Sequence, residues 1–377
     1  MENSMGDMTD SEGGGQPAGI KMPASNGYFR CREIHQSELP GIMRKHIYTG
    51  VMGAAWGTAV SDVIFTFFVV AIGMNTLYIG AMQAISLWLV GMQFLSALST
   101  QRTGRRKEIW FWSAMSDRCL RFIGILYAFW LWHTSLHWTA PVVLVYFICV
   151  SSFFGNMAGP PWFSWLADII PEDKHGAFWG RRSAWVAAVV SLTLLPAAYF
   201  VDYSSTTNYK VQAMVIVFTI ATVAGILDLL IHGTIPEPAM EIPKQNHFLH
   251  HFFEPIRDRR YRRFLLFGIC WNFAMVLGGS LLSYYFIENL GLKDHLFKLV
   301  LVFTIPSLLF SSLTGYWSGN LVDKIGAKRV LLLGHIFWSL LPFFWIFSGP
   351  GWGLVWILIS SIITGISSTA AMTAAIR

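Results

Sequence analysis

Long apolar runs alternate with short polar or Gly/Pro-containing links along most of the chain. An α-helix rises about 1.5 Å per residue, so about 20 apolar residues cross the roughly 30 Å hydrocarbon core of a bilayer. Because the runs are continuous rather than alternating, they indicate helices and not the strands of a membrane barrel. The pattern predicts an all-α polytopic membrane protein with about ten transmembrane helices, at residues 48–73, 78–99, 108–132, 140–165, 178–201, 211–233, 263–287, 295–318, 329–348 and 353–375.

The composition agrees with a chain that lies mostly in lipid. Charged residues make up 13% of the 377 positions and hydrophobic residues 54%, with a mean hydropathy of +0.50. A soluble domain carries about 25% charged residues, which excludes a soluble enzyme. The sequence has no phosphate-binding loop, zinc motif or catalytic triad. We therefore expect no enzymatic activity, no cofactor and no metal site.

Lys and Arg are concentrated in alternate connections between the predicted helices. If the N-terminus is cytoplasmic, the clusters Arg44–Lys45, Arg102–Lys107, Arg181–Arg182 and Arg257–Arg263 all fall on the cytoplasmic side. Loops on the cytoplasmic side of a membrane carry such an excess, so we predict this orientation in a bacterial-type cytoplasmic (inner) membrane. The net charge of +6 is explained by this topology, and nucleic-acid binding is not expected.

The spacing of the predicted helices divides the chain into four segments. Residues 1–45 contain no apolar run, which is typical of a disordered cytoplasmic tail. Residues 46–233 are predicted to form a six-helix bundle, and residues 263–377 a four-helix bundle. The segment 234–262 between them, with several prolines and a basic run, is predicted to be a cytoplasmic linker.

A short loop sequence after the second predicted helix is repeated after the eighth. Both copies contain a basic residue, one further residue, a glycine and then a basic cluster. Repeated halves are a common plan for secondary transporters. The residues that carry the pattern are Arg102, Gly104 and Arg105 in the first copy, and Gly319, Asp323, Lys324, Gly326, Lys328 and Arg329 in the second.

The second copy resembles the signature loop of the major facilitator superfamily, G-x-x-x-D-[RK]-x-G-x-[KR]-[KR], whereas the first copy departs from it at Ala97 and Gln101. The resemblance implies two helical bundles around a central site. It also implies that these loops act as a conformational latch, in which a carboxylate caps a neighbouring helix. A simple orienting hairpin is the alternative. The family plan usually has twelve helices, so the resemblance further implies that this chain lacks the last two.

Ionisable side chains inside the predicted helices are hypotheses for function, because each costs about 2.5–3.5 kcal/mol on insertion scales. The candidates are Asp62, Arg118, Arg121 and Asp228. Their similar depth would let Asp62 pair with Arg118 or Arg121 if the helices touch. One interpretation is a site for a substrate or coupling ion that exchanges partners during transport. The alternative is a static buried ion pair that locks helices together.

The resemblance also implies that helices one, four, seven and ten line the central cavity. The candidate side chains on these helices are Trp56, Asn156, Trp271 and Asn272. Aromatic rings with a few hydrogen-bonding groups suit small organic solutes. The alternative is that the aromatic residues belong to the belts at the membrane surface.

The connection between the fourth and fifth helices resembles the D-x-x-P-x-x-x-R-G-x-x-x-G-R loop of many bacterial facilitator proteins, with His175 in place of the first Arg. Asp168 and Arg181 are therefore candidates for a cytoplasmic gate pair. A static brace within the loop is the alternative.

These patterns together predict a secondary active transporter that moves a small organic solute across the cytoplasmic membrane by alternating access. We expect it to act as a monomer, with the lipid bilayer and the solute as its partners. Proton symport through Asp62 is the hypothesis for energy coupling. The alternative function is that of a non-transporting membrane receptor or an assembly scaffold with the same fold.

Overall fold

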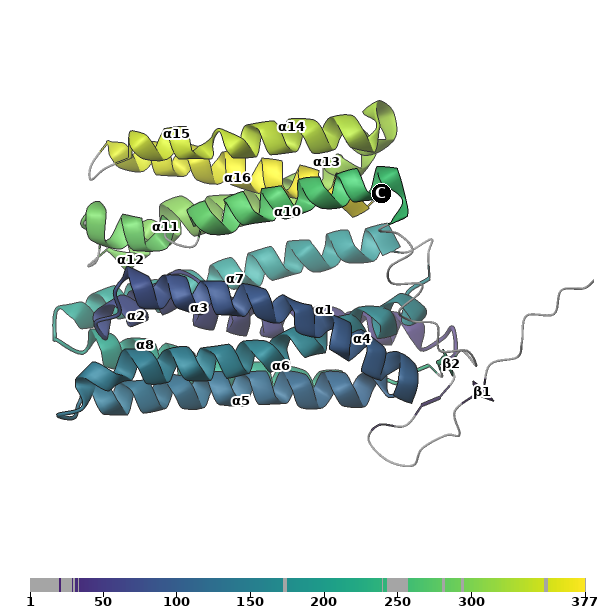
Figure 1. The fold of residues 1–377 in the computed structure, drawn as a ribbon, viewed down its shortest axis with the longest axis horizontal. Coiled ribbons are helices and arrows are strands. Elements are labelled where there is room, and N and C mark those ends of the chain that lie inside the picture. Colours follow the sequence, from purple (N-terminus) through teal and green to yellow (C-terminus); the bar gives the residue numbers. More distant parts are fainter. Residues whose placement is uncertain are drawn as a thin grey trace, which may run out of the picture.

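The computed structural model shows helices that run nearly parallel to one another (Figure 1). The described residues are 20–21, 29, 31–32, 34–171, 175–238, 240–242, 257–279, 282–292, 295–348 and 352–376. The predicted tail 1–45 and linker 234–262 therefore lie partly outside the described residues. The division of the chain into bundles at these boundaries stays a prediction.

The N-terminal group of helices follows the first six predicted spans. Short polar, Gly or Pro-containing links separate its long apolar segments, as the sequence pattern requires. Its members are α1 (Leu39–Ser61), α2 (Val63–Ala71), α3 (Thr76–Trp88), α4 (Met92–Thr103), α5 (Arg106–Trp132), α6 (Ala140–Ile169), α7 (His175–Ser205) and α8 (Lys210–His232), with short 3₁₀ turns at Leu89–Gly91 and His137–Thr139.

The C-terminal group follows the last four predicted spans. Two of these spans contain π-helical turns, at Tyr285–Asn289 and Val300–Thr304. A two-residue strand near the N-terminus, β1 (Ile20–Lys21), pairs with β2 (Glu241–Ile242). The helices of the group are α10 (Arg259–Gly279), α11 (Leu282–Tyr284), α12 (Leu296–Leu299), α13 (Ile305–Ile325), α14 (Ala327–Ser339), α15 (Leu341–Ile346) and α16 (Gly353–Ile376).

The predicted fold class, an all-α polytopic membrane protein, is confirmed. Eight helical stretches among the described residues are long and apolar enough to cross a membrane. The two other predicted spans correspond to α5 and to α10 with α11. α5 has 27 residues, which at about 1.5 Å per residue also exceeds the thickness of the hydrocarbon core. Its lower apolarity reflects the charged residues near its middle.

The first predicted helix differs from the expectation in two ways. α1 begins at Leu39, with Pro40 in the first turn, so residues 39–45 are helical and do not belong to a disordered tail. The helix then breaks at Asp62, whose ψ of −146° is not helical, and continues as α2. The prediction of one continuous helix over 48–73 is wrong here, because an apolar run does not report a break at a single residue.

Both copies of the repeated loop contain a glycine with a positive φ angle. Gly104 ends α4 with φ +66°, and Gly326 separates α13 from α14 with φ +87°. These angles lie in the left-handed region that glycine adopts without strain. The two glycines lie at the same end of the helices, which we name the motif end (Figure 1).

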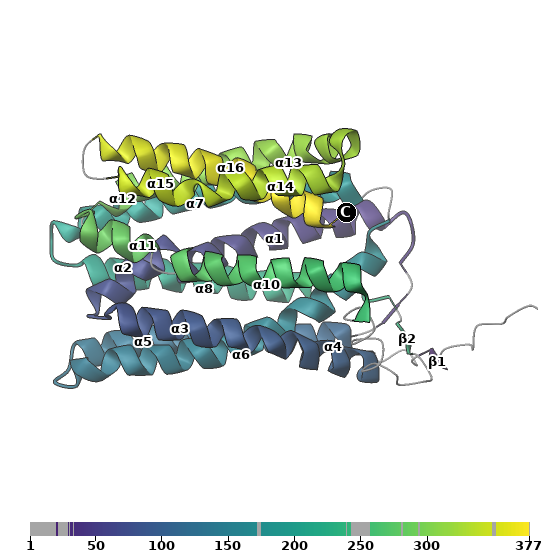
Figure 2. The same ribbon diagram turned by 45° about the horizontal axis from the view of Figure 1, so that its top comes forward.

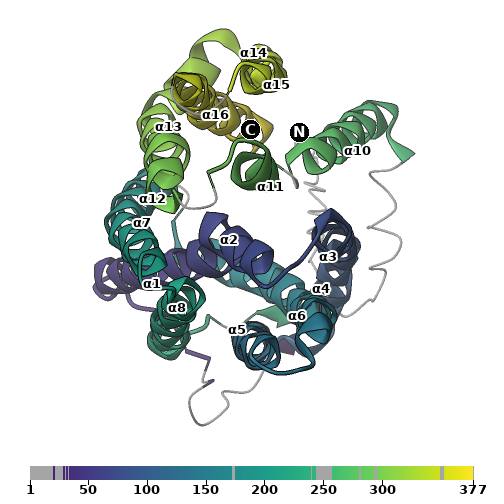
Figure 3. The same cartoon turned by 90° about the vertical axis from the view of Figure 1, so that its left-hand side faces the viewer.

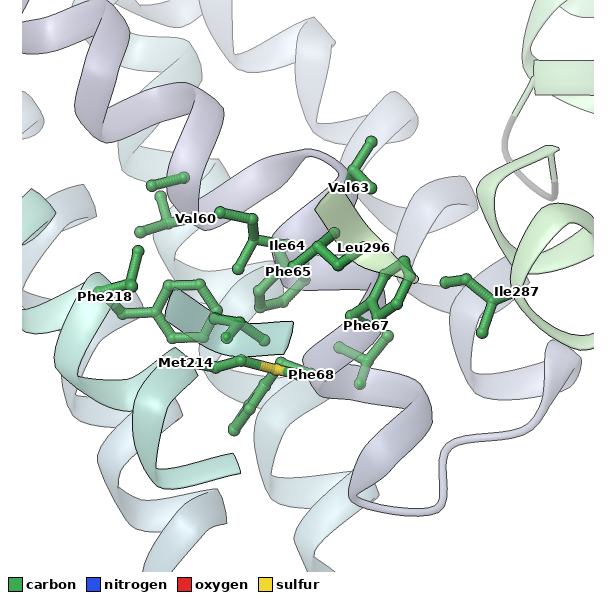
Figure 4. Packing of buried hydrophobic residues seen from close by; sticks show 14 of the residues in the cluster. Val60, Val63, Ile64, Phe65, Phe67, Phe68, Met214, Phe218, Ile287 and Leu296 are labelled. Atoms are coloured by element: carbon green, nitrogen blue, oxygen red, sulfur yellow. The ribbon is translucent and has the colours of Figure 1, made fainter. Parts of the chain in front are cut away.

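The two groups of helices contact each other through α2 and α7. α2 packs against α11 and α12, and α7 packs against α12 and α13. The view along the helices shows α7 and α13 side by side (Figure 3). A continuous apolar cluster crosses this contact, with Phe65, Phe67 and Phe68 of α2 near Ile287 and Leu296 (Figure 4). The end opposite the motif end is therefore closed by buried apolar side chains.

Candidate functional site

A polar cavity of about 330 Å³ lies within the N-terminal group, between α1, α5, α6, α7 and α8. α1 packs along α8, and α5 packs closely on α6 (Figure 2), and the cavity that these helices line is open on one side. The lining side chains that carry a charge or a ring are Trp56, Trp110, Asp117, Arg118, Trp162, Arg182, Asp228 and His232.

A larger cavity of about 500 Å³ lies between α1, α7 and α8. Its walls are aliphatic side chains together with Phe200, and its polar groups are the hydroxyls of Thr58 and Thr193. Because no charged group lines it, this cavity offers little specific chemistry. The smaller polar cavity is the candidate site.

An ion pair joins α5 to α8 at the wall of the polar cavity. Arg118 Nη2 donates to Asp228 Oδ2 at 2.6 Å, and the side chains are 9% and 7% exposed. The Trp56 ring lies over the Arg118 guanidinium at 4.8 Å, in a cation–π contact. A Cβ on Gly53 would lie 2.7 Å from Asp228 Oδ2, so this glycine provides the space for the pair.

A second carboxylate, Asp117, is held between α5 and α6. Ser151 Oγ donates to Asp117 Oδ1 at 2.5 Å, and Arg121 Nη2 lies 3.5 Å from the same oxygen. A Cβ on Gly155 would lie 3.0 Å from Asp117 Oδ2. Both carboxylates of the cavity are therefore engaged by a cation, and a glycine accommodates each of them.

Arg182 of α7 is held by aromatic faces. Its guanidinium lies 5.5 Å from the ring centre of Trp162 and 5.4 Å from that of Trp179. A Cβ on Gly50 would lie 2.6 Å from Arg182 Nε, so α1 leaves room for this side chain as well. Within the described part of the chain Arg182 forms no ion pair, because Asp228 acts on it only at longer range.

Two histidines meet at the side of the cavity nearer the motif end. His232 Nε2 accepts a hydrogen bond from Trp162 Nε1 at 3.2 Å, and its Nδ1 lies 2.8 Å from Thr49 Oγ1. A ring nitrogen that accepts a hydrogen bond carries no proton, so this geometry is that of a neutral imidazole. The His46 ring meets His232 edge-on at 4.5 Å. The charge of the cavity is thus carried by arginines and aspartates.

The structure changes the partners predicted for the intramembrane charges. Arg118 pairs with Asp228, and Arg121 with Asp117, whereas Asp62 forms no ion pair with any described residue. The pairing of Asp62 with Arg118 or Arg121, which similar depth would allow, is therefore not formed among the described residues. Similar depth in the membrane does not determine which helix faces face each other, and α5 turns these arginines toward α8 and its own preceding turn.

The predicted cavity side chains of the N-terminal group lie in different environments. Trp56 lines the polar cavity. Asn156 of α6 instead accepts a hydrogen bond from Gln93 Nε2 of α4 at 3.3 Å, and its amide donates to the Ser152 carbonyl at 2.8 Å. Asn156 therefore connects α6 to α4 outside this cavity.

The predicted cavity side chains of the C-terminal group lie on α10. The Trp271 ring packs against the His335 ring of α14 at 4.2 Å. Asn272 is exposed, and its amide donates to the Gly268 carbonyl at 2.8 Å. Neither residue lines the polar cavity, so a role in solute binding stays a prediction for both.

A second group of charges lies at the motif end. Arg106, which is 1% exposed, forms ion pairs with Asp168 of α6 and, at 3.4 Å, with Glu237 after α8. Burial raises the pKa of the Glu237 carboxyl above its usual value, against the lowering effect of Arg106. In this structure Asp168 pairs with Arg106, and Arg181 is exposed, so the gate role of Asp168 and Arg181 stays a prediction.

The other predicted latch residues lie around the two repeated loops. Arg102 is in the last turn of α4, and Arg105 forms an exposed ion pair with Glu108 at 3.6 Å. The residues of the second loop that the structure shows to be exposed are Lys324, Lys328 and Arg329. The side chains of Gly319 and Asp323 lie outside what the structure describes, so the latch role stays a prediction.

Sequence reasoning missed several residues of the two sites. Arg182 stands beside the nominated Arg181, and the helical period alone could have shown that adjacent residues face different directions. Gly50 and Gly53 lie three residues apart on α1, and this spacing indicates a helix face on which a neighbouring side chain can pack against the backbone. The pairing of Glu237 could not be predicted from its neighbours in the sequence, because it depends on the chain after α8 returning to Arg106 of α5.

Charged side chains inside a multi-pass helical bundle are typical of membrane transport proteins. The family model of the Major Facilitator Superfamily matches residues 47–377. The chain belongs to this superfamily, and it is a multi-pass membrane protein. No curated protein matches the sequence.

Solved structures of the same fold include several transporters. A bacterial homologue of the human lysosomal transporter Spinster, inward-facing and unoccupied, is similar with a TM-score of 0.61 and 14% identity, over 90% of this chain and 76% of that chain. A variant of the nucleoside transporter NupG gives 0.59 and 13%, over 89% and 81%. A D-xylose-proton symporter gives 0.54 and 17%, over 89% and 80%. At these identities the similarity establishes the fold alone.

Proposed function

We propose that this protein is a secondary active transporter that moves a small organic solute across the cytoplasmic membrane by alternating access. The observation that carries the proposal is the charged, aromatic-walled cavity within the helices of a Major Facilitator Superfamily chain. The solved transporters of nucleosides and xylose are similar in fold and act on small polar organic molecules. In this proposal the protein acts as a monomer, with its N-terminus in the cytoplasm.

Proton symport through Asp62 is our proposal for the coupling. Asp62 lies where α1 breaks and α2 begins, and it forms no ion pair within the described part of the chain. Asp62 is not among the lining residues of the polar cavity, whose carboxylates, Asp117 and Asp228, are each engaged by an arginine. A carboxylate that no cation holds is available to bind and release a proton at a point where the first membrane span can bend.

Reconstituted flux tests the proposal directly. The full chain is placed in proteoliposomes with an imposed pH gradient, and the uptake of labelled nucleosides, sugars and small organic acids is measured. We expect concentrative uptake of at least one of these solutes, and its collapse when an ionophore dissipates the gradient. Absence of flux for every solute, with the fold intact, would favour a receptor or scaffold instead.

Two variants test the coupling residue. Asp62→Asn is expected to abolish accumulation driven by the pH gradient and to leave solute exchange at equal pH unchanged. Glu108→Gln is the matched control, because it removes a carboxylate from an exposed position of α5. Gradient-driven accumulation that survives Asp62→Asn rules out Asp62 as the proton carrier.

A further inference from the structure

Three arginines lie in or directly beside the polar cavity, whereas its lining residues supply two carboxylates. Its carboxylates, Asp117 and Asp228, are matched by Arg121 and Arg118. Arg182 is the third cation, and among the described residues no carboxylate forms an ion pair with it. A cation that is largely buried between helices without a carboxylate partner is costly, and an anionic ligand removes that cost.

The unused hydrogen-bonding groups of the cavity are donors. Trp56 Nε1, Arg118 Nη1 and Arg182 Nε are buried without an acceptor among the described residues. None of the cavity-lining residues has a buried acceptor without a donor in the same part of the structure. Buried donors without partners are unfavourable, so the complementary ligand carries several acceptor atoms.

The size and walls of the cavity limit the ligand further. Its volume of about 330 Å³ is at the lower end of the range known for ligand pockets, about 300–1,000 Å³. The rings of Trp56, Trp110 and Trp162 form an apolar wall beside the arginines. A phosphate monoester carries about −1.5 to −2 charges at neutral pH. A monocarboxylate carries one charge, which matches the one arginine, Arg182, that forms no ion pair among the described residues.

We propose that the cavity between α1, α5, α6, α7 and α8 binds a small organic monocarboxylate, whose carboxylate is neutralised by Arg182 and whose apolar body lies against the tryptophans. The planar guanidinium matches the two oxygens of a carboxylate, and the faces of Trp162 and Trp179 hold it in place. This inference rests on the proposed transport function only in naming the bound molecule as the solute; binding itself is testable without flux.

Matched probes of equal shape test the charge preference on the wild-type chain. Benzoate, benzamide and benzylamine are compared, and so are indole-3-acetate, indole-3-acetamide and tryptamine. Affinity is measured by calorimetry on the full chain in lipid nanodiscs. We expect each carboxylate to bind at least about tenfold more tightly than its amide, because a charged partner strengthens the hydrogen bonds, and each amine to bind most weakly. The proposal is overturned if no carboxylate binds more tightly than its amide.

Adjacent arginines provide a matched pair of variants. Arg182→Gln is expected to remove the preference for carboxylate over amide, whereas Arg181→Gln, which removes the same charge from an exposed neighbour, preserves it. Thermal unfolding of both variants without a probe shows whether they are folded. An Arg182→Gln chain that is folded and keeps the preference contradicts the assignment of Arg182.

Binding and flux together separate this inference from the proposed function. Carboxylate binding that depends on Arg182, without flux of any solute, supports the site and contradicts the transporter. Flux of a neutral solute that is unchanged by Arg182→Gln supports the transporter and contradicts the site as its solute-binding cavity.

Discussion

The N-terminal helices are joined by ion pairs as well as by neutral hydrogen bonds, whereas the polar side-chain contacts between α13 and α16 are made by hydroxyl groups. Arg118–Asp228 and Arg106–Asp168 connect α5 with α8 and with α6. In the C-terminal group, Ser311 lies 2.5 Å from Thr369, and Ser318 donates to Thr373 at 3.0 Å. No ion pair occurs within the described residues of α10–α16.

Ion pairs and hydroxyl pairs are two ways of satisfying polar side chains between helices, and they differ in energy. A hydroxyl pair carries no net charge and stabilises helix packing modestly, by about 0.6 kcal/mol on average. An ion pair adds little when it is complete, but it is costly to break because one charge is left behind. The ion pairs between helices therefore lie in the N-terminal group, whereas the described contacts between α13 and α16 are neutral.

The largest expected effect comes from breaking the Arg118–Asp228 pair. Arg118→Ala leaves Asp228 buried without its cation, and we expect it to lower the free energy of unfolding by about 3–5 kcal/mol. The double variant with Arg118→Met and Asp228→Leu removes both charges and is expected to lose much less. Denaturant unfolding in detergent micelles measures both. Equal losses in the single and double variants would contradict an uncompensated charge as the cause.

The glycines that accommodate the charges give the next effect. Gly53→Ala places a Cβ 2.7 Å from Asp228 Oδ2, and such overpacking costs about 1–3 kcal/mol. Gly57→Ala, one turn further along α1, is the control, since no atom lies within 4 Å of the added Cβ. The same unfolding measurement is expected to show a loss for Gly53→Ala only. A comparable loss at both positions would indicate a general sensitivity of α1.

Equivalent serine substitutions compare the two groups directly. Ser151→Ala removes the donor to the Asp117 carboxylate, and hydrogen bonds to charged groups contribute about 1.5–3 kcal/mol. Ser311→Ala removes a neutral hydroxyl contact to Thr369, which contributes about 0.5–1.5 kcal/mol. We expect the unfolding free energy to fall further for Ser151→Ala. A reversed order would remove the distinction between the charged and neutral groups.

The smallest effect concerns pH and the segment after α8. Burial raises the pKa of Glu237 in the folded chain, so its contribution to stability is complete below the usual pKa of a glutamate. That contribution is lost as the pH rises through the higher pKa of the folded state. Glu237→Gln is expected to remove this dependence, with an effect of about 1 kcal/mol or less. The readout is fluorescence of Trp165, whose Nε1 donates to the Pro236 carbonyl at 3.1 Å.

The same pH profile of fluorescence in the wild-type chain and in Glu237→Gln would contradict this assignment. Glu108→Gln is the control, since Glu108 is exposed on α5 and lies outside the Glu237 contacts.

The helices could be predicted closely, but the site could be predicted only in part. The lengths of α6, α8 and α16 follow from apolar runs that the membrane requires, and the turns at Gly104 and Gly326 follow from a repeated loop. The partners of Arg118 and Asp168 could not be predicted from the sequence, because they lie on helices far away along the chain. Neither depth nor spacing tells which faces of two helices meet.

The sequence by itself determined that this chain crosses a membrane many times as helices, because its long continuous apolar runs satisfy their own backbone hydrogen bonds in lipid only as helices. It also determined which ionisable groups are inside. Only the tertiary structure decided that Asp228 belongs to Arg118, that Arg182 has no carboxylate partner among the described residues, and that a cavity lies beside both. The physical reason is that helix rotation and packing, not composition, set the short distances at which charges and ligands interact.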